Sequence, residues 1–232
     1  MVSENLKRLP NRITMFRIFL IILFIPTLLF NDILSGSLGS LAKSLQTRAS
    51  FLIMFTSYAA LVIFILASIS DFFDGFIARK YNIESNFGRV MDPLADKIMV
   101  ISALIGFVQL RIVPAWMVII VIGREFLISG IRIMAAQSGR IIAASNWGKA
   151  KTVIEIITIL AILLLICVKN TITDLTGQPW QEILIKSGEM GSALFEIMYY
   201  TPYWLMFIAT SVSLISGLEY YFKNSSIFEK EI

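Results

Sequence analysis

The chain has 232 residues, of which 57% are hydrophobic, and it carries a formal net charge of +4 at pH 7. This apolar fraction and a mean hydropathy of +0.78 argue against a soluble domain, in which about 45–50% of residues are apolar. The lack of histidine and the single cysteine, Cys167, exclude a Ser-His-Asp triad and a disulfide framework. The basic residues do not cluster in a soluble domain, so we expect no nucleic-acid partner and a single membrane domain over residues 1–232.

Apolar runs separated by polar segments predict an all-α integral membrane protein with six transmembrane helices. Residues 1–12 form a basic lead, which we expect to lie on the membrane surface as a short N-terminal interfacial amphipathic helix. No small-residue cleavage site follows the first apolar run, so that run is predicted to be a retained helix rather than a signal peptide. Each run approaches the roughly 20 residues that a bilayer crossing needs. The predicted spans are 13–30, 51–70, 89–108, 116–134, 149–168 and 203–221.

The connections between these runs differ in length and composition. Residues 31–50 are rich in Gly and Ser and predict a loop with a helical turn near Leu41. The polar connection 80–87 is short, so the two helices that it joins should be antiparallel neighbours. Arg111 and Pro114 mark a tight turn, and residues 137–147 form another polar connection. The mixed, amphipathic segment 169–198 is interrupted by Gly177, Pro179, Gly188 and Gly191.

The distribution of lysine and arginine predicts the orientation in the membrane. With both termini placed inside, 15 of the 20 basic residues fall on the inner side. This bias predicts a multi-pass protein of the inner (cytoplasmic) membrane, with both termini and the residues around 71–96 facing the cytoplasm.

Residues 71–96, the aspartate motif, contain Asp71, Asp74, Asp92 and Asp96 between two apolar runs. Residues three or four apart share a helix face, so each pair projects from one side of its helix and the two pairs can converge. A carboxylate inside a membrane costs about 2.5–3.5 kcal/mol unless it is paired or hydrated. A bound divalent cation would relieve both this cost and the mutual repulsion. Hard oxygen ligands favour Mg, Mn or Ca over Zn or Cu. The alternative is a set of solvated charges at helix ends.

The neighbours of the aspartates point to a phosphate-containing ligand. Gly75, Ala78 and Gly88 leave room for close approach to the backbone. Arg79 supplies a planar, permanently charged fork that suits phosphate. Pro93 marks a helix start or kink beside the site. Together, these residues suggest a phosphoanhydride held over a metal centre.

The motif resembles the signature of the CDP-alcohol phosphotransferases, with every fixed position present. It reads Asp71-x-x-Asp74-Gly75-x-x-Ala78-Arg79, eight residues, then Gly88-x-x-x-Asp92-x-x-x-Asp96. The resemblance implies a six-helix integral membrane enzyme, usually a homodimer. Such enzymes cleave a CDP-activated alcohol, often CDP-diacylglycerol, pass the phosphatidyl group to an acceptor hydroxyl and release CMP.

The resemblance also implies roles for individual residues. Asp71, Asp74, Asp92 and, in part, Asp96 would hold two Mg2+ ions, with Mn2+ possible, and Asp96 would be the general base. The sequence alone does not separate a ligand from a base among these four. The residues expected to contact CDP-diacylglycerol are Asn11, Thr14, Gly75, Ala78, Arg79, Ser85 and Gly88. Ser85 is equally well interpreted as a loop or helix-cap residue.

A second group of basic residues predicts a phosphorylated acceptor. Arg124 lies well inside an apolar run, and a buried arginine needs a cavity or a partner. With Arg132, Lys149 and Lys151 it would form a basic pocket beside the metals, although snorkelling explains Lys151 equally well. Three segments, 124–132, 147–152 and 216–220, resemble the branch of the family called phosphatidylglycerophosphate synthases, and so does 10–17.

This resemblance implies transfer of the phosphatidyl group from CDP-diacylglycerol to glycerol 3-phosphate. Inositol phosphate and phosphatidylglycerol remain open as acceptors with the same chemistry. A cation transporter that uses the aspartates is an alternative from another class. The basic residues Arg79, Lys80 and Arg89 nearby, and the lack of an inverted repeat, argue against it. A catalytically silent lipid-binding protein is a third possibility, which the complete motif weakens.

Overall fold

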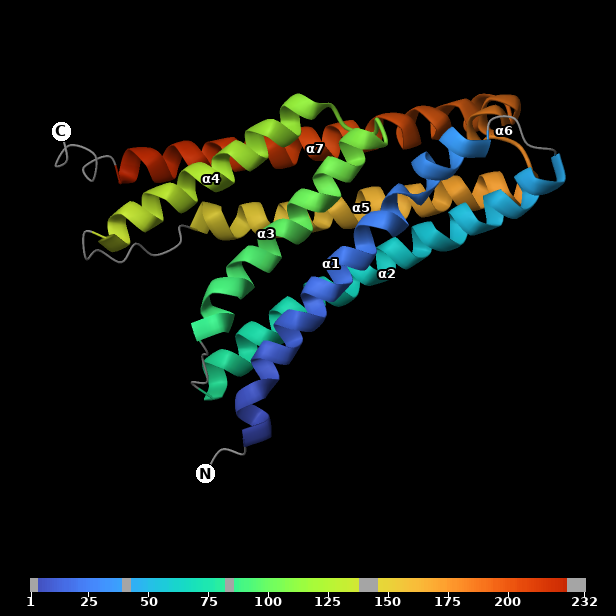
Figure 1. Cartoon of the computed structure of the whole chain (residues 1–232). Coiled ribbons are helices and arrows are strands. Elements are labelled where there is room, and N and C mark those ends of the chain that lie inside the picture. Colours follow the sequence, from blue (N-terminus) through green and yellow to red (C-terminus); the bar gives the residue numbers. More distant parts are fainter. Residues whose placement is uncertain (1–3, 39–42, 82–85, 138–145, 225–232) are drawn as a thin grey trace.

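The computed structural model describes residues 4–38, 43–81, 86–137 and 146–224; within these ranges it gives no side-chain detail for 4–12, 31, 33–38, 43–49, 71–81, 86–90, 92, 93 and 146. All elements in the described ranges are helices, as predicted (Figure 1). They are α1 (Glu4–Leu38), α2 (Lys43–Tyr81), α3 (Asn86–Gln109), α4 (Ala115–Gln137), α5 (Asn146–Thr176), α6 (Trp180–Lys186) and α7 (Glu189–Lys223).

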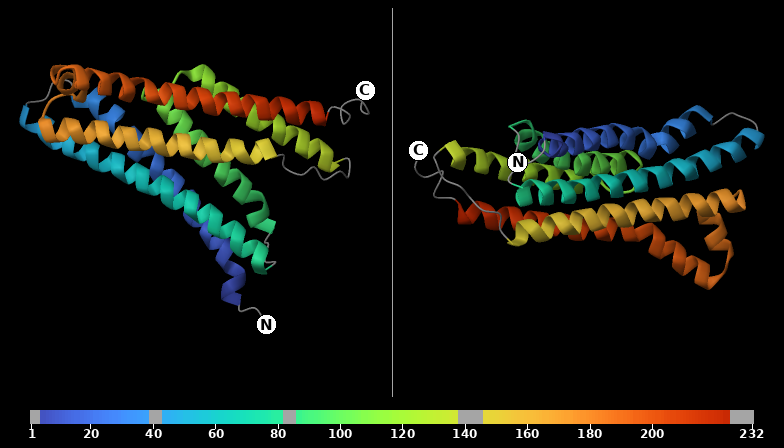
Figure 2. Two further views of the ribbon diagram at one scale, coloured as in Figure 1. Left: turned by 180° about the vertical axis from the view of Figure 1, so that it is seen from behind. Right: turned by 90° about the horizontal axis from the view of Figure 1, so that it is seen from below.

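The long helices pack side by side in an order that differs from their order in the chain. α1 packs against α2 and α3, α2 against α5, and α5 against α7, while α4 lies along α7. The views in Figures 1 and 2 show α1, α2 and α3 diverging from α4, α5 and α7 towards the end that holds the N-terminus. The short α6 folds back on the start of α7 at the opposite end.

One hydrophobic core joins α1–α5 and α7. Phe24 of α1 meets Phe64 of α2 with ring centroids 5.8 Å apart, and both side chains are buried. Phe107 of α3, Met117 of α4 and Met206 of α7 are fully buried in the same cluster. The outward faces are also apolar: Ile119 is 67% exposed and Phe126 is 69% exposed. Apolar side chains on the outside, with backbone groups bonded within helices, suit a lipid environment.

Four stretches in the described ranges are long and apolar enough to cross a membrane. They are Ile13–Phe30, Ser50–Ser70, Trp147–Thr176 and Glu189–Lys223. α3 and α4 are shorter and carry charged residues within their lengths, including Lys97 and Arg124. The chain therefore has the character of a membrane protein, and the crossing by α3 and α4 that completes six spans stays a prediction.

The predicted loop at 31–50 is wrong for most of its length. α1 continues to Leu38 and α2 begins at Lys43. Two contacts accompany these extensions: Gln109 Nε2 donates to Asp32 Oδ2 at 2.7 Å, and Ser50 Oγ donates to Asp174 Oδ1 at 2.7 Å. Gly and Ser lower helix propensity by only about 1 kcal/mol per residue or less, so packing and side-chain bonds override it.

Two further boundaries differ from the prediction. Residues 4–12 form the first turns of α1 and not a helix of their own, so their place on the membrane surface stays a prediction. Gly177, with φ of +64°, and Gly188, with φ of +83°, do interrupt the segment after α5. Gly191 does not: it lies within α7, where a Cβ would come 2.1 Å from the Leu184 carbonyl oxygen of α6. The tight turn at Arg111 and Pro114 lies, as predicted, between α3 and α4.

Candidate functional site

The aspartate motif lies where α2 ends and α3 begins. Asp71 and Asp74 are on the last turns of α2, and Asp92 and Asp96 are on the first turns of α3. These helix ends lie next to each other at the end of the molecule that holds the N-terminus (Figure 1). Their helical placement agrees with the predicted spacing of each pair. Asp96 is partly buried. The structure does not describe the side chains of the other three aspartates, so the convergence of the four carboxylates stays a prediction.

The residues expected to contact the CDP-linked substrate are spread over the same three helices. Three of them are on α2 (Gly75, Ala78 and Arg79), Gly88 is on α3 and Asn11 is on α1. For these five residues the structure describes the backbone alone, and Ser85 lies outside the described residues. Thr14 on α1 is fully buried. Its position is that of a residue inside the bundle and not on its surface.

Arg17 is a further candidate for the functional site, and the sequence analysis did not assign it there. It lies one turn after Thr14 on α1, and only 1% of its surface is exposed. A guanidinium is charged at all ordinary pH values and is expensive to bury without compensation. The signal in the sequence was a lone arginine inside the apolar run 13–30.

A network of buried and partly buried charges joins α4, α5 and α7. Glu125 Oε1 accepts from Arg124 Nη1 and from Lys151 Nζ, each at 2.6 Å. Lys151 also reaches Glu155 Oε2 at 2.7 Å, and its side chain is 5% exposed. Arg124 Nη2 donates to Ser216 Oγ of α7 at 2.7 Å. We call Arg124, Glu125, Lys151 and Glu155 the buried ion network; it holds two cations and two carboxylates.

The buried ion network is connected to the helix that carries Asp92 and Asp96. Lys97 Nζ of α3 donates to Ser129 Oγ of α4. Ser129 Oγ in turn donates to the Glu125 backbone oxygen at 2.7 Å. Lys97 follows Asp96 directly, so the start of α3 is tied to the turn of α4 that carries Glu125.

The four residues of the predicted basic pocket do not all meet in one place. Arg124 and Lys151 are brought together through Glu125. Arg132 is more exposed: its Nε donates to Tyr220 Oη at 3.3 Å, and its Cζ lies 5.6 Å from the centroid of that ring. Lys149 is exposed at the start of α5. Lys151 is buried, so the snorkelling interpretation is wrong for it.

The α7 segment 216–220 forms the surface on which these α4 arginines rest. Ser216 accepts from Arg124, and Tyr220 contacts Arg132. Gly217 lies between them, and a Cβ there would come 2.8 Å from Arg124 Cγ. A small residue is therefore needed for Arg124 to lie against α7.

Three residues of this region, Glu125, Glu155 and Ser129, were not predicted as site residues. Glu155 could have been found from the sequence, because it lies four residues after Lys151 within an apolar run.

The comparison with known sequences assigns the family. The sequence profile described as CDP-alcohol phosphatidyltransferase matches residues 7–185, which include most of α1, all of α2–α5 and the whole aspartate motif. The chain belongs to the CDP-alcohol phosphatidyltransferase family. This confirms the resemblance drawn from the motif and adds that the match extends across the buried ion network.

Curated members of the CDP-alcohol phosphatidyltransferase family are similar over most of the chain. A Bacillus subtilis protein named CDP-diacylglycerol–glycerol-3-phosphate 3-phosphatidyltransferase is 36% identical over 93% of this chain and 94% of its own length. Proteins with the same name from Mycoplasma pneumoniae (37% over 66% of each chain) and Rickettsia felis (35% over 68% of this chain and 76% of that one) are also similar.

The donor chemistry of this family member fits a divalent metal ion. The aspartates on the ends of α2 and α3 offer only carboxylate oxygens, which Mg2+ and Mn2+ prefer. Asp96, the member whose side chain is described, is partly buried. The residues present therefore fit the ion that the family implies.

Proposed function

We propose that this protein is an integral membrane enzyme of phospholipid biosynthesis, which transfers the phosphatidyl group of CDP-diacylglycerol to glycerol 3-phosphate. The products are phosphatidylglycerol phosphate and CMP. The observation that carries this proposal is similarity over 93% of the chain to a protein named for that reaction, together with the complete aspartate motif at the facing ends of α2 and α3. The homodimer that the family resemblance implies is part of the proposal.

The reaction exchanges one P–O bond for another. The sn-1 hydroxyl oxygen of glycerol 3-phosphate forms a bond to the phosphorus that carries the diacylglycerol, and the bond from that phosphorus to the CMP oxygen breaks. Asp96 accepts the hydroxyl proton as general base. When bound, two Mg2+ ions held by Asp71, Asp74, Asp92 and Asp96 would neutralise the pyrophosphate and stabilise the leaving group.

Residues of α1, α2 and α3 would position the nucleotide. Arg79 offers a bidentate fork to a phosphate, while Gly75, Ala78 and Gly88 allow the substrate close to the backbone. Asn11, Thr14 and Ser85 are the remaining polar contacts in the proposal. The burial of Thr14 supports a role inside the bundle, where water does not compete for its hydroxyl.

The buried ion network supports an anionic acceptor. Arg124 Nε is buried and has no hydrogen-bond partner among the described residues, so this guanidinium keeps a donor for an incoming phosphate while Glu125 and Ser216 hold its other nitrogens. Lys151 lies on the same glutamate. Arg132, near the C-terminal end of α4, and Lys149, near the N-terminal end of α5, extend this basic group. Glycerol 3-phosphate needs such a group; a neutral alcohol does not.

The proposed orientation follows the basic residues. The motif and both termini face the cytoplasm, where CDP-linked substrates and Mg2+ occur, and the membrane is the inner membrane.

An acceptor assay tests the reaction and its specificity together. The protein, purified in detergent with Mg2+ and CDP-diacylglycerol, is offered labelled glycerol 3-phosphate, inositol phosphate, serine and phosphatidylglycerol in parallel reactions. We expect labelled lipid and CMP with glycerol 3-phosphate alone. Turnover with another acceptor would retain the chemistry and reject the assignment of the acceptor residues. No CMP with any acceptor would reject the enzyme in favour of a transporter or a silent binding protein.

A further inference from the structure

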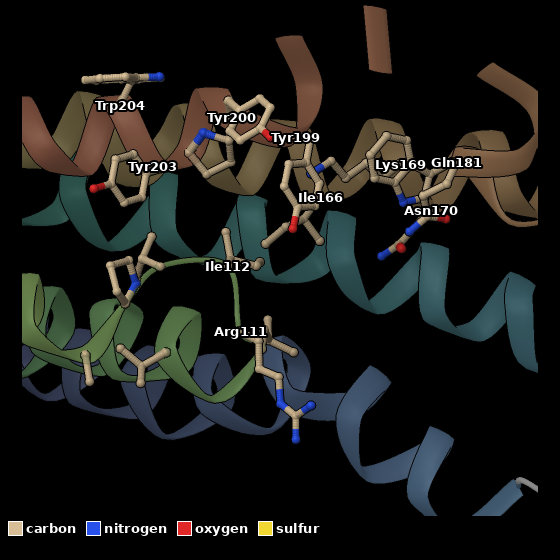
Figure 3. A pocket seen from close by; sticks show the side chains of 17 residues that line it. Arg111, Ile112, Ile166, Lys169, Asn170, Gln181, Tyr199, Tyr200, Tyr203 and Trp204 are labelled. Carbon is tan, nitrogen blue, oxygen red and sulfur yellow. The ribbon is translucent and has the colours of Figure 1, made fainter. Parts of the chain in front are cut away.

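A large pocket lies at the end of the molecule remote from the aspartate motif. It has a volume of about 910 Å3 and is open to the surface. Its walls are the turn between α3 and α4, the C-terminal part of α5, the start of α6 and the first half of α7 (Figure 3). From Asp96 to the end of α3 the helix rises roughly 20 Å, so this pocket is separate from the proposed active site.

Aromatic side chains form one wall of the pocket. Trp180 of α6 stacks on Phe195 with centroids 5.5 Å apart, and Phe195 stacks on Tyr199 with centroids 5.7 Å apart. Tyr199 and Tyr203 each present a ring to the cavity, and both remain well exposed. Tyrosine and tryptophan favour the level of lipid headgroups, because one end of each ring is apolar and the other forms hydrogen bonds. The wall therefore has the composition of a headgroup-level surface.

The described residues that line the pocket carry positive charge and include no carboxylate. Lys169 Nζ lies 4.7 Å from the centroid of the Trp180 ring, and the lysine is about half-buried. Beside it, Asn170 is held by a hydrogen bond from its Nδ2 to Ser57 Oγ at 2.6 Å. Arg111 lies at the rim, with its guanidinium directed away from the tyrosines in Figure 3. The residues that line the pocket include no Asp or Glu, so an anion is the complementary ligand.

We infer that this pocket binds one anionic phospholipid of the leaflet opposite the aspartate motif. The phosphate would lie at Lys169, and the apolar part of the lipid would lie against Ile112, Ile166 and Pro202. A small soluble anion would leave these apolar walls and the exposed rings uncovered, whereas a diacyl lipid covers both. The inference rests on the position and chemistry of the pocket and not on the transfer reaction.

Quenching of Trp180 fluorescence by brominated lipids tests the inference. The chain has four tryptophans, so Trp116→Phe, Trp147→Phe and Trp204→Phe leave Trp180 as the reporter. The protein is placed in phosphatidylcholine nanodiscs that contain brominated phosphatidylglycerol or, in parallel, brominated phosphatidylcholine. We expect half-maximal quenching at a several-fold lower mole fraction of the anionic lipid.

Two substitutions decide whether the preference belongs to the pocket. Lys169→Gln should abolish the difference between the two lipids. Lys186→Gln, at an exposed lysine of α6 that pairs with Glu182 and does not line the pocket, should leave it intact. Comparing the two lipids within each variant removes any change in the intrinsic fluorescence of Trp180. Thermal unfolding of Lys169→Gln in the same nanodiscs, measured in parallel, reports that the variant is folded.

Five outcomes would overturn the inference, and the first four come from the two lipids, the two variants and the phosphate competition. They are equal quenching by both lipids in the parent protein, an undiminished preference in Lys169→Gln, loss of preference in Lys186→Gln as well, and displacement of the bromolipid by excess inorganic phosphate. Protection of Trp180 from both lipids would also overturn it, because a second copy would then cover the pocket. A preserved lipid preference in a protein without transferase activity would reject the proposed function alone.

Discussion

Glu125 is the residue on which the buried ion network depends. One of its oxygens accepts from Arg124 and from Lys151, so its charge is shared between two cations from different helices. Buried pairs contribute little net stability when complete, but removing one partner leaves a charge without compensation. Glu125 is thus a positioning residue for the two cations proposed to meet the acceptor phosphate.

The substitution Glu125→Gln should lower the free energy of unfolding by about 3 kcal/mol, because Arg124 and Lys151 lose their shared counter-charge. It should also raise the KM for glycerol 3-phosphate. Thermal unfolding in detergent and acceptor titration measure the two effects. The control is Glu182→Gln, which breaks the exposed pair with Lys186 (3.4 Å) and should cost less than about 1 kcal/mol. Equal effects of the two substitutions would contradict a special role for Glu125.

At the aspartate motif, Asp92→Asn should reduce turnover by more than about a hundredfold. Even the replacement of a residue that only hydrogen-bonds to a metal ligand lowers metal affinity or activity by about 10–100-fold. The protein should remain inserted and should unfold at a similar temperature, because the side chain retains its size. Asp174→Asn provides the comparison. Asp174 accepts from Ser50 Oγ at the end of α5 remote from the motif, and its replacement should leave turnover unchanged. Near-normal activity of Asp92→Asn would reject its assignment as a metal ligand.

At the scale of elements, the contact between α4 and α7 depends on a small residue. Gly217 leaves space for Arg124, which is held on one side by Glu125 and on the other by Ser216. α4 packs against α7, and it is through this contact that the C-terminal segment 216–220 supports the basic residues of α4. This explains why a segment far from the aspartates resembles the same branch of the family.

Gly217→Ala should cost about 1–3 kcal/mol, because the added Cβ would lie 2.8 Å from Arg124 Cγ and that side chain is anchored at its end. Turnover should fall with it, as Arg124 is displaced. Gly130→Ala on α4 is the matched control: among the described residues, a Cβ there has no neighbour within 4 Å. Unfolding in detergent and the acceptor assay distinguish the two variants. A harmless Gly217→Ala would show that Arg124 does not need this packing.

At the scale of the whole molecule, the ends of α7 should lie on opposite sides of the membrane. Lys186, just before α7, and Lys223, at its last turn, are both exposed. In a Cys167→Ala background, Lys186→Cys should react with a membrane-impermeant maleimide in intact spheroplasts, and Lys223→Cys only after permeabilisation. The opposite pattern would invert the proposed orientation, and labelling of both in intact cells would contradict a crossing by α7.

The sequence by itself determined the helical class, the membrane character and the family. These properties follow from local information, because apolar run length reports bilayer crossing and the fixed spacing of Asp71–Asp96 places each pair of acids on one helix face. The helix extents at 31–50 were not predictable in this way, since contacts such as Gln109–Asp32 join residues far apart in the chain. Similarly, the sequence predicted that Arg124 and Lys151 belong to a basic pocket. Their shared partner Glu125 became evident only when α4 and α5 were placed together. Charge pairing, small-residue clearance at Gly217 and the pocket beside Lys169 are properties of helix packing, and only the tertiary structure decided them.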